Sequence, residues 1–445
     1  MILIIKQPAT HTACPARNEH ARRYKGELLM ATNKKTTAKK PVAAKKKTAA
    51  AKPVAKKKTP AKKAPPAAAK SKPASPKKPA PAKKPAQKSK PAAAAPRVNP
   101  RVALVTGAAG FAGSHMTDLL IENGYHVIAT DLENADRKFV NPAAEFIPAD
   151  ITSPESLKGL FAKKPGYVYH PAAVFDYEAP WDLCERVNVG GMHNMCEASL
   201  AMGVKRLLLF STVSVYGYPK PEELPVREEN AKRPGTNYER SKWMQEETAV
   251  EFARKGLPTS IVRPAPLYGP RNIYGMATIL FLMAKFPILP FPVNLDNRMV
   301  GVSVRDVCRA ALFLADQPKA IGEAYNVIDN SSYTMREFAE HVCPLMGVRI
   351  LPIFIPRELF FLFGNQVADI SRSVGKIFHT RPFVEKDMVY YLKAIYSFSN
   401  EKLRSLGFEF EHPDLLEGLT ETIQWYKENH YLDRRELWTK VFERV

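Results

Sequence analysis

A tyrosine and a lysine four residues apart, Tyr238 and Lys242, are the residues of this sequence best suited to proton transfer. The surrounding sequence predicts a helix from Tyr238 to about Lys255, and residues four apart on a helix share one face. A phenol with a pKa near 10 is a poor base at neutral pH, but a neighbouring ammonium group favours its phenolate form. Two hydroxyl side chains, Ser211 and Thr212, follow an earlier predicted strand. The tyrosine and lysine pair indicates acid–base chemistry.

A glycine-rich turn between a predicted strand and a predicted helix could hold the phosphates of a dinucleotide. An apolar run over residues 102–106 leads into Gly107-Ala-Ala-Gly110-Phe-Ala-Gly113, and a helical stretch follows over residues 114–123. We expect Gly107 to allow the tight turn, Gly110 to let the backbone approach the pyrophosphate, and Gly113 to let the helix pack closely. The N-terminus of that helix offers unpaired N–H groups and a positive dipole end to phosphate.

An acidic residue after the next predicted strand bears on the choice of cofactor. Residues 125–130 form that strand, and Asp131 follows it directly. The Asp131 carboxylate can accept hydrogen bonds from the adenosine ribose hydroxyls and would repel a 2′-phosphate. A strand, glycine turn, helix, strand and acidic residue in this order predict a site for NAD, with NADP less favoured.

The glycine spacing and the motifs that follow it resemble the extended branch of the short-chain dehydrogenase/reductase superfamily, which includes epimerases, dehydratases and hydroxysteroid dehydrogenases. The similar region runs from about residue 101 to about residue 431. Its further motifs are Asp150-Ile151 after the third strand, His170-Pro171-Ala172-Ala173 after the fourth, Asn188-Val189-x-Gly191 in a helix, and Arg263-Pro264 in the sixth strand. The resemblance implies an α/β fold, namely a Rossmann-type doubly wound parallel sheet with a smaller C-terminal α/β substrate lobe.

The same resemblance implies roles for individual residues. Tyr238 would give or take the substrate proton, and Lys242 would also bind the nicotinamide ribose. Thr212, or its neighbour Ser211, would steady the substrate oxygen. The implied cofactor contacts are Gly107, Ala109, Gly110, Phe111, Ala112, Gly113, Asp131, Asp150, Ile151, Pro171, Ala172, Ala173, Asn188, Tyr238, Lys242 and Pro264.

Other polar residues of this region receive a structural interpretation. The spacing of the histidines and cysteines suggests no metal site, and we predict none. We expect His170 and His193 to be ordinary strand and helix residues. We expect Glu246 and Glu247 to form a solvated helix face.

Two departures from the nucleotide-sugar members of this superfamily bear on the substrate. Those members usually have Asn where this chain has Pro266, and an Arg for the diphosphate where this chain has Met299, with Arg298 one step away. The C-terminal lobe is instead rich in large apolar side chains, for example over residues 279–283 and 286–291. A predominantly apolar pocket suits a lipophilic ring alcohol. The alternatives are that these runs form the core of the lobe or touch a membrane surface.

We therefore predict an NAD(P)-dependent oxidoreductase that acts on a secondary alcohol or ketone of a hydrophobic substrate. The substrate is sterol- or steroid-like by resemblance, because Arg263-Pro264 and the segment from Tyr396 to Arg404 are similar to the 3β-hydroxysteroid and sterol dehydrogenase group. One alternative is a nucleotide-sugar epimerase or dehydratase, which can use the same residues. A second alternative is a cofactor-binding module tethered to DNA, although such a module would not need the Tyr238 and Lys242 pair.

Positive charge is concentrated in the N-terminal part of the chain. Residues 1–100 hold 27 Lys and Arg and 2 Asp and Glu, a balance of +25, whereas the remaining 345 residues hold 39 and 42, a balance of −3. Residues 31–100 contain no aromatic or acidic residue, so they cannot bury enough apolar surface to fold and are predicted to be disordered. Their composition resembles linker-histone tails. We predict non-specific contact of residues 31–97 with nucleic acid or another anionic surface; a solubilising tail is the alternative.

Changes of composition also predict the domain boundaries. Residues 1–29 would be an unstructured or untranslated leader, with translation beginning at Met30, and residues 30–100 the Lys/Ala/Pro-rich arm. Residues 101–265 would form the NAD-binding domain and residues 266–445 mainly the substrate lobe, with returns to the core near 298–328. Five cysteines without a C-x-x-C pair, and the lack of an uninterrupted apolar run of membrane length, favour a cytoplasmic location. Association with the nucleoid through the arm and a homodimer are compatible with the sequence.

Overall fold

Seven parallel strands form the centre of the fold. The structure is a computed structural model that describes residues 98–177, 179–378, 384, 389 and 396–433. The strands are hydrogen-bonded in the order β11, β6, β5, β4, β1, β2, β3. Their bounds are Asn99–Thr106 (β1), His126–Thr130 (β2), Glu145–Phe146 (β3), Pro165–His170 (β4), Arg206–Phe210 (β5), Thr259–Pro264 (β6) and Ala324–Val327 (β11). Every residue of β4, β5 and β6 is buried, as expected for strands covered on both faces.

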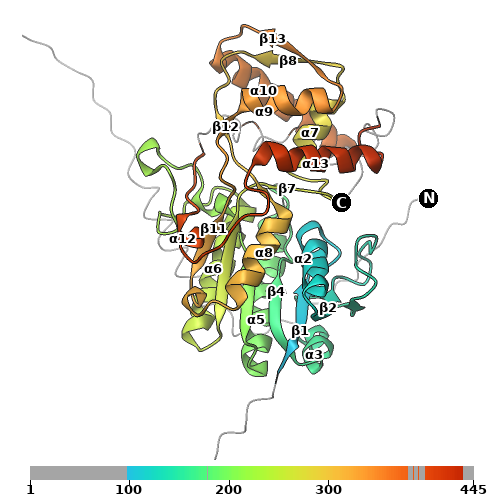
Figure 1. The fold of residues 1–445 in the computed structure, drawn as a ribbon, viewed down its shortest axis with the longest axis vertical. Coiled ribbons are helices and arrows are strands. Elements are labelled where there is room, and N and C mark those ends of the chain that lie inside the picture. The colour runs from blue at the N-terminus through green and yellow to red at the C-terminus, as the bar shows by residue number, and fades with distance from the viewer. Residues whose placement is uncertain (1–97, 178, 379–383, 385–388, 390–395, 434–445) are drawn as a thin grey trace, which may run out of the picture. The chain divides into compact units, whose positions relative to one another are not determined.

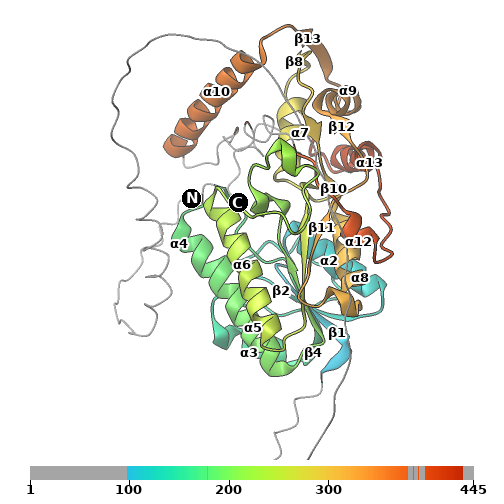
Figure 2. The ribbon, with the colours of Figure 1, turned by 90° about the vertical axis from the view of Figure 1, so that its left-hand side faces the viewer.

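Helices cover both faces of the sheet (Figures 1 and 2). On one face, α2 (Phe111–Glu122) packs against α8 (Val304–Ala315). On the other face, α5 (Gly191–Met202) packs against α3 (Pro154–Ala162) and α6 (Asn237–Arg254). A separate cluster of buried apolar side chains fills each of the two layers. The predicted Rossmann-type doubly wound sheet is confirmed.

A smaller α/β lobe, with an apolar core of its own, lies beyond the sheet (Figure 1). Its strands pair as β7 with β10, β9 with β12, and β8 with β13. The strands of the lobe are Leu267–Tyr268 (β7), Ile288–Pro292 (β8), Arg298–Met299 (β9), Val302–Ser303 (β10), Tyr333–Thr334 (β12) and Arg349–Ile353 (β13). Its helices are Met276–Ala284 (α7), Met335–Leu345 (α9), Arg357–Phe378 (α10) and Leu415–Glu428 (α13).

Short helical turns complete the described chain. They are Trp181–Cys184 (α4), the π-helical turn Glu185–Gly190 (η1), the 3₁₀ turns Val213–Tyr216 (η2), Pro221–Glu223 (η3) and Pro318–Ala320 (η4), and Glu401–Arg404 (α12). Within the described residues, no helix combines the length and the apolar character needed to cross a membrane. The leader and the cationic arm predicted for residues 1–97 lie outside the described residues.

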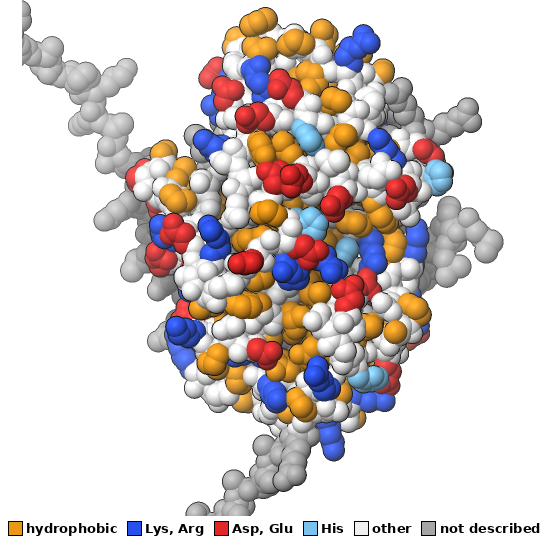
Figure 3. Space-filling view, in the orientation of Figure 1, with side chains coloured by type: hydrophobic (Ala, Val, Ile, Leu, Met, Phe, Trp, Pro, Cys, Tyr) orange, Lys and Arg blue, Asp and Glu red, His pale blue; other side chains and the backbone are white. Residues whose placement is uncertain are grey.

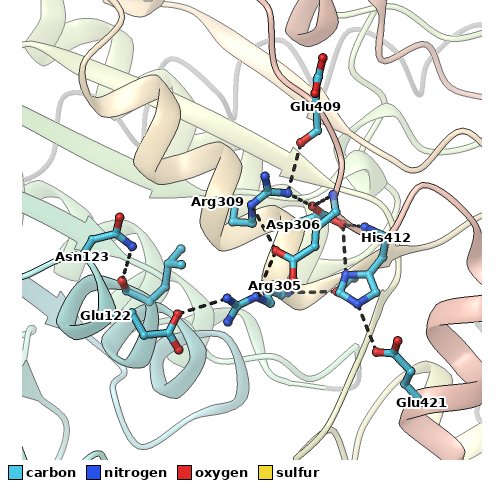
Figure 4. A network of polar contacts seen from close by, with 11 residues as sticks. Glu122, Asn123, Arg305, Asp306, Arg309, Glu409, His412 and Glu421 are labelled. Atoms are coloured by element: carbon cyan, nitrogen blue, oxygen red, sulfur yellow. Dashed lines mark hydrogen bonds and ion pairs between the residues drawn. The ribbon is translucent and has the colours of Figure 1, made fainter.

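A polar network joins the segment that precedes α13 to the start of α8 (Figure 4). The Asp306 carboxylate accepts hydrogen bonds from the backbone amides of Glu411 and His412 at 2.7 and 2.8 Å. It also accepts one from Arg309 Nη1 at 2.8 Å. The Nε2 atom of the His412 ring lies 3.2 Å from a carboxylate oxygen of Glu421 in α13. These contacts fix the lobe helix α13 relative to a helix of the sheet layer.

Candidate active site

Helix α6 carries both residues of the predicted proton-transfer pair. The helix begins at Asn237 behind a capping box, in which Thr236 Oγ1 accepts a hydrogen bond from the amide of Glu239 at 3.2 Å. Glu239 in turn accepts one from the amide of Thr236 at 3.0 Å. The box satisfies two otherwise unpaired amides and fixes the start of the helix. Tyr238 therefore lies in the first turn, and Lys242 lies one turn later on the same buried face.

The Tyr238 ring is enclosed by other aromatic rings. Its centroid lies 5.1 Å from that of Phe175 and 5.4 Å from that of Tyr177, both in edge-to-face arrangements. Burial, followed by the influence of Tyr177 and Glu239, raises the pKa of Tyr238 well above 10. Burial in this structure therefore disfavours the phenolate form that we expected Lys242 to favour. Tyr238 holds its proton at neutral pH.

The Lys242 side chain lines the cavity and is only 2% exposed. Its Nζ atom donates a hydrogen bond to the carbonyl oxygen of Phe210, at the end of β5, at 2.5 Å. Burial lowers the pKa of Lys242 to about 7, and the charge of Glu246 opposes that decrease. Lys242 can therefore exchange a proton near neutral pH more readily than a solvated lysine.

The two neighbouring hydroxyl residues after β5 have different partners. The Ser211 hydroxyl donates a 2.5 Å hydrogen bond to Glu246 Oε1 in the interior of the protein. The Thr212 hydroxyl donates to Ser214 Oγ at 3.0 Å and accepts a hydrogen bond from the Ser214 amide at 3.1 Å. Both residues line the cavity, but Thr212 is the more exposed of the two. The Thr212 hydroxyl is therefore better placed to meet a substrate oxygen.

A buried ion pair lies under these residues, and the sequence had suggested a different role for one of its members. Glu246, which we expected on a solvated helix face, is 1% exposed, and its carboxylate is 2.6 Å from Arg263 Nη2. Arg263 also donates to the Tyr216 hydroxyl at 2.8 Å and to the Glu228 carbonyl oxygen at 3.1 Å. The expectation was wrong because Glu246 lies four residues after Lys242, on the face of α6 that packs on the sheet. Two features of the sequence could have indicated this buried position: the spacing of Glu246 from Lys242, and the presence of Arg263 in β6.

Asn188 joins the helix of Tyr238 to the loop that follows β4. Its amide accepts a hydrogen bond from Val174 N at 2.7 Å and donates one to Val174 O at 3.2 Å. The same amide nitrogen donates to Ser241 Oγ at 2.8 Å, and the Ser241 hydroxyl donates to the carbonyl oxygen of Tyr238 at 2.7 Å. Asn188 lies within the irregular π-helical turn η1 and is fully buried. It thus supports the cavity wall from behind.

The glycine turn has the close approach that its sequence predicted. Gly107 has a φ of +60°, and a Cβ at this position would lie 2.9 Å from the Cα of Ala172. A Cβ at Gly113 would lie 1.9 Å from the carbonyl oxygen of Gly107, so only glycine lets α2 begin this near the turn. Gly110 precedes the first residue of α2, and its amide donates to the Gly107 carbonyl oxygen at 3.0 Å. The turn leaves the N-terminus of α2 open to a phosphate group.

Asp131 stands at the end of β2, where a ribose would lie in a dinucleotide site. Its carboxylate accepts hydrogen bonds from the amide of Ala109 at 3.1 Å and from the amide of Leu132 at 2.8 Å. Because these amides hold the carboxylate in place, it faces the cavity in a fixed orientation. The residues present therefore fit a dinucleotide without a 2′-phosphate.

One cavity of about 1210 Å³ joins the glycine turn to the Tyr238 region. Of the predicted site residues, those that line it are Gly107, Gly110, Phe111, Ala112, Gly113, Asp131, Asp150, Ile151, Pro171, Ala172, Ala173, Ser211, Thr212, Tyr238, Lys242 and Pro264. Ala109 and Asn188 do not line it, but each is hydrogen-bonded to a residue that does, Asp131 and Val174 respectively. The volume exceeds the usual range of about 300–1,000 Å³ for a single small ligand, which leaves room for a cofactor and a substrate together.

Aromatic and apolar side chains from distant parts of the chain form the rest of the wall. The rings that sequence reasoning did not assign to the site are Phe139, Phe175, Tyr177, Phe210, Tyr218, Tyr274, Phe281, Tyr396, Phe398 and Tyr431. Many of them lie in loops and in the lobe, where no local pattern indicates a cavity. The apolar runs of residues 276–281 were the one available signal, and α7 does place Met276, Ile279 and Phe281 at the wall.

The two positions at which the sequence differs from the nucleotide-sugar enzymes, Pro266 and Met299, both lie at the cavity. Pro266 and Met299 line the cavity, and Met299 is 1% exposed. Successive side chains of a strand point to opposite sides, so the neighbouring Arg298 in β9 lies outside the set of lining residues. Arg298 donates instead to the carbonyl oxygen of Ser332 at 3.2 Å and to its hydroxyl. The position of the expected diphosphate contact is therefore occupied by a thioether.

The comparison with protein families decides the identity of this site. The sequence model of the NAD dependent epimerase/dehydratase family matches residues 103–327, which is half of the chain. The chain belongs to this family. It is an NAD-dependent enzyme of the extended short-chain dehydrogenase/reductase type, and NAD is its cofactor, in agreement with the fit of the glycine turn and Asp131.

Relatives of known name are similar over most of their length. A putative UDP-glucose 4-epimerase from Methanocaldococcus jannaschii is 29% identical over 340 residues, which cover 74% of this chain and 99% of the relative. A short-chain dehydrogenase/reductase family 42E member 1 from Bos taurus is 25% identical over 346 residues, which cover 73% of this chain and 86% of the relative. The crystal structure of a UDP-glucose 4-epimerase with UDP-glucose from Thermotoga maritima matches with a TM-score of 0.59 and 26% identity, over 74% of this chain and 99% of that one.

Proposed function

We propose that this enzyme oxidises a secondary alcohol, or reduces the corresponding ketone, on a substrate whose bound part is largely apolar and sterol-like. The observation that carries the proposal is the wall of the cavity beside Tyr238. Aromatic and aliphatic side chains surround the phenol, and Met299 stands where a nucleotide-sugar enzyme would usually place an arginine. A wall of this kind binds a hydrophobic ring system by burial and offers a diphosphate no arginine at the Met299 position.

In this proposal each residue of the site has one task. Tyr238 gives its proton to the carbonyl oxygen during reduction, and during oxidation its phenolate, the minor form at neutral pH, takes the proton back. Thr212 donates a hydrogen bond to the same oxygen, and Lys242 holds the ribose next to the nicotinamide. Bound NAD supplies or accepts the hydride, which is the chemistry that the protein itself lacks. Asp131 and the N-terminus of α2 hold the adenosine half of the cofactor.

The test is turnover of a panel of lipophilic secondary alcohols with NAD, followed as net formation of NADH. We expect Tyr238→Phe to lower kcat by at least about a hundredfold, because it removes the group that transfers the proton. The affinity for NAD should be retained. The matched control is Tyr177→Phe, which removes a hydroxyl from the ring that lies 5.4 Å from Tyr238. Full activity of Tyr238→Phe would contradict the catalytic assignment.

A second candidate is nucleotide-sugar epimerisation, and the names of the relatives favour it. Two of the similar proteins above are called UDP-glucose 4-epimerase or putative UDP-glucose 4-epimerase. An epimerase returns the hydride to its substrate, so it converts UDP-glucose without net formation of NADH. Detection of a UDP-sugar product without NADH, together with no activity on the alcohol panel, would replace the first proposal with this one.

The partners predicted from the sequence remain part of the proposal. Residues 31–97 carry the lysines that we expect to contact nucleic acid or another anionic surface, with nucleoid association as one consequence. A homodimer in the cytoplasm is the assembly that we consider compatible with the sequence. The salt dependence of polyanion binding and the mass of the native particle test these points.

A further inference from the structure

Large apolar side chains are exposed at one end of the lobe. Among the described residues, fifteen large hydrophobic side chains are exposed, and ten of them belong to residues 286–288 and 351–377. These segments contain the start of β8, the end of β13 and helix α10, which lie together at the top of Figure 1. Figure 3 shows hydrophobic side chains gathered there over β8 and β13. Four others, Leu132, Phe175, Tyr218 and Ile273, line the active-site cavity and are explained by it.

Helix α10 turns six large apolar side chains outward, whereas Phe361 and several small residues are buried. The exposed apolar side chains are Leu359, Leu362, Phe363, Val367, Ile370 and Ile377, which we call the α10 stripe. Their spacing of three, four and seven residues places them on one face of the helix. On the inward side, Ala368, Ser371 and Gly375 are buried. This is the reverse of a helix that packs only on a protein core.

The α10 stripe extends along most of the length of the helix. From Leu359 to Ile377 the helix rises about 27 Å, at about 1.5 Å per residue. Figure 2 shows α10 projecting from the end of the lobe where β8 and β13 lie. Phe354, in the turn between β13 and α10, is 91% exposed. An aromatic ring in an exposed turn next to an amphipathic helix is the arrangement by which monotopic proteins enter the interface of a bilayer.

Charge complementarity identifies the kind of surface. Helix α10 itself carries three basic and two acidic residues, so it contributes little electrostatic attraction. The attraction must come from residues 1–100, with their balance of 27 basic to 2 acidic residues. Stable attachment to a membrane usually needs two signals, and an apolar group combined with a polybasic segment is one such pair. This chain carries both signals.

We propose that the α10 stripe, together with Phe354, inserts into the interface of an anionic lipid bilayer, and that the cationic arm strengthens this attachment. The helix lies in the plane of the membrane surface and does not cross the bilayer. The inference rests on the exposed side chains and the charge of the arm, and it stands independently of the substrate proposed above.

Flotation of the full-length protein with lipid vesicles tests the inference. We expect the protein to float with vesicles of mixed phosphatidylglycerol and phosphatidylcholine, and the bound fraction to fall as salt is added because the contribution of the arm is screened. The double variant Leu362→Glu/Phe363→Glu should lower the partition coefficient by about tenfold or more, because it removes apolar area from the interface. The variant Ile370→Gln should act in the same direction with a smaller effect.

The matched control is Ile321→Glu, which changes an equally exposed apolar side chain next to η4, away from α10. It should bind vesicles like the unaltered protein. All variants should keep their thermal unfolding midpoint and their affinity for NAD, which would exclude misfolding as the cause. Unchanged flotation of the double variant would overturn the proposal. A change of the free protein from dimer to monomer in that variant, with flotation retained, would also overturn it and would assign the stripe to a second copy of the chain.

Discussion

Ser211 and Thr212 are neighbours in the sequence, but their hydroxyl groups serve different parts of the molecule. Ser211 donates its hydrogen bond into the buried Glu246 and Arg263 pair, whereas Thr212 is bonded to Ser214 at the edge of the cavity. We therefore predict that Thr212→Val lowers kcat by about a hundredfold, the usual loss when one donor to a reacting oxygen is removed. Ser211→Ala should change kcat by less than about tenfold. Steady-state kinetics on the active substrate would measure both values.

The conservative variant Thr212→Ser provides the control for this comparison, because it keeps the hydroxyl and should retain most of the activity. The two residues would exchange roles if Ser211→Ala were the more damaging substitution. In that case the Glu246 side chain would have to turn away from Ser211 when substrate is bound.

A second residue-level prediction concerns the stability of the site. The side chains of Glu246 and Arg263 are 2% and 5% exposed, so each neutralises a charge that water cannot reach. Glu246→Gln leaves the guanidinium buried without its counter-ion, and we expect a loss of about 3–5 kcal/mol in the free energy of unfolding. The adjacent and exposed Glu247 is the matched control, and Glu247→Gln should change stability by less than about 0.5 kcal/mol. Urea denaturation of the two variants would measure the difference, and equal midpoints would contradict the assignment.

The sequence was sufficient to predict where residues lie when their positions depend on local order along the chain. The glycines of the turn, Asp131 after β2, and Tyr238 with Lys242 on one helix are all fixed by spacing within a single unit. The sequence could not place Glu246, because its partner Arg263 lies in another element, 17 residues further along the chain. It also could not show that burial among Phe175 and Tyr177 raises the pKa of Tyr238.

At the scale of elements, the buried strands were the most predictable parts. Apolar runs such as residues 206–210 and 259–264 can be stable only as central strands covered on both faces, and both are observed there. The two-residue strand β3 has too short a pattern to be found from its own sequence. Helix α10 was equally hidden, because an apolar run reads the same whether its side chains face a core or solvent.

The contact between α8 and the segment before α13 leads to a prediction about pH (Figure 4). The Asp306 carboxylate, 3.6 Å from His412 Nδ1, favours the protonated imidazole and raises the pKa of His412 above its usual 6.5. Burial would raise the pKa of Asp306, but hydrogen bonds from His412, two backbone amides and Arg309 outweigh burial and lower it. The contribution of His412 to stability is therefore full below pH 6.5 and is lost as the pH rises through its raised pKa. The contribution of Asp306 is full above about pH 3.8 and is lost as the pH falls through its lowered pKa.

We accordingly predict that His412→Ala destabilises the protein more at pH 6 than at pH 8. The difference should be on the order of 1 kcal/mol, because the attraction to the exposed Glu421 is screened by water and the buried Asp306 keeps its hydrogen bonds from Arg309 and two backbone amides. Thermal unfolding of both proteins across this range would measure it. The exposed His193, on α5, is the control, and His193→Ala should show no such pH dependence. A constant difference between His412→Ala and the unaltered protein would mean that His412 acts by packing alone.

At the scale of the whole molecule, the positive charge is concentrated in the first 100 residues of the chain. Residues 1–100 carry a balance of +25 and residues 101–445 a balance of −3. Two kinds of contact with the surroundings therefore have different physical origins. Contact through the arm is electrostatic and depends on salt, whereas contact through the α10 stripe depends on buried apolar area and persists when charges are screened.

The arm also leads to a prediction for nucleic acid. Because residues 31–97 offer lysines without aromatic side chains, they can neutralise phosphates but cannot stack on bases. We predict that the full-length protein binds two duplexes of unrelated sequence with equal affinity. If the arm neutralises about six phosphates, that affinity should fall by roughly a thousandfold between about 50 and about 200 mM salt. Fluorescence anisotropy with the two duplexes would measure the slope. An affinity that is independent of salt would show that contact with DNA, if present, arises from the folded body, whose net charge is negative and whose surface would then need a local basic site.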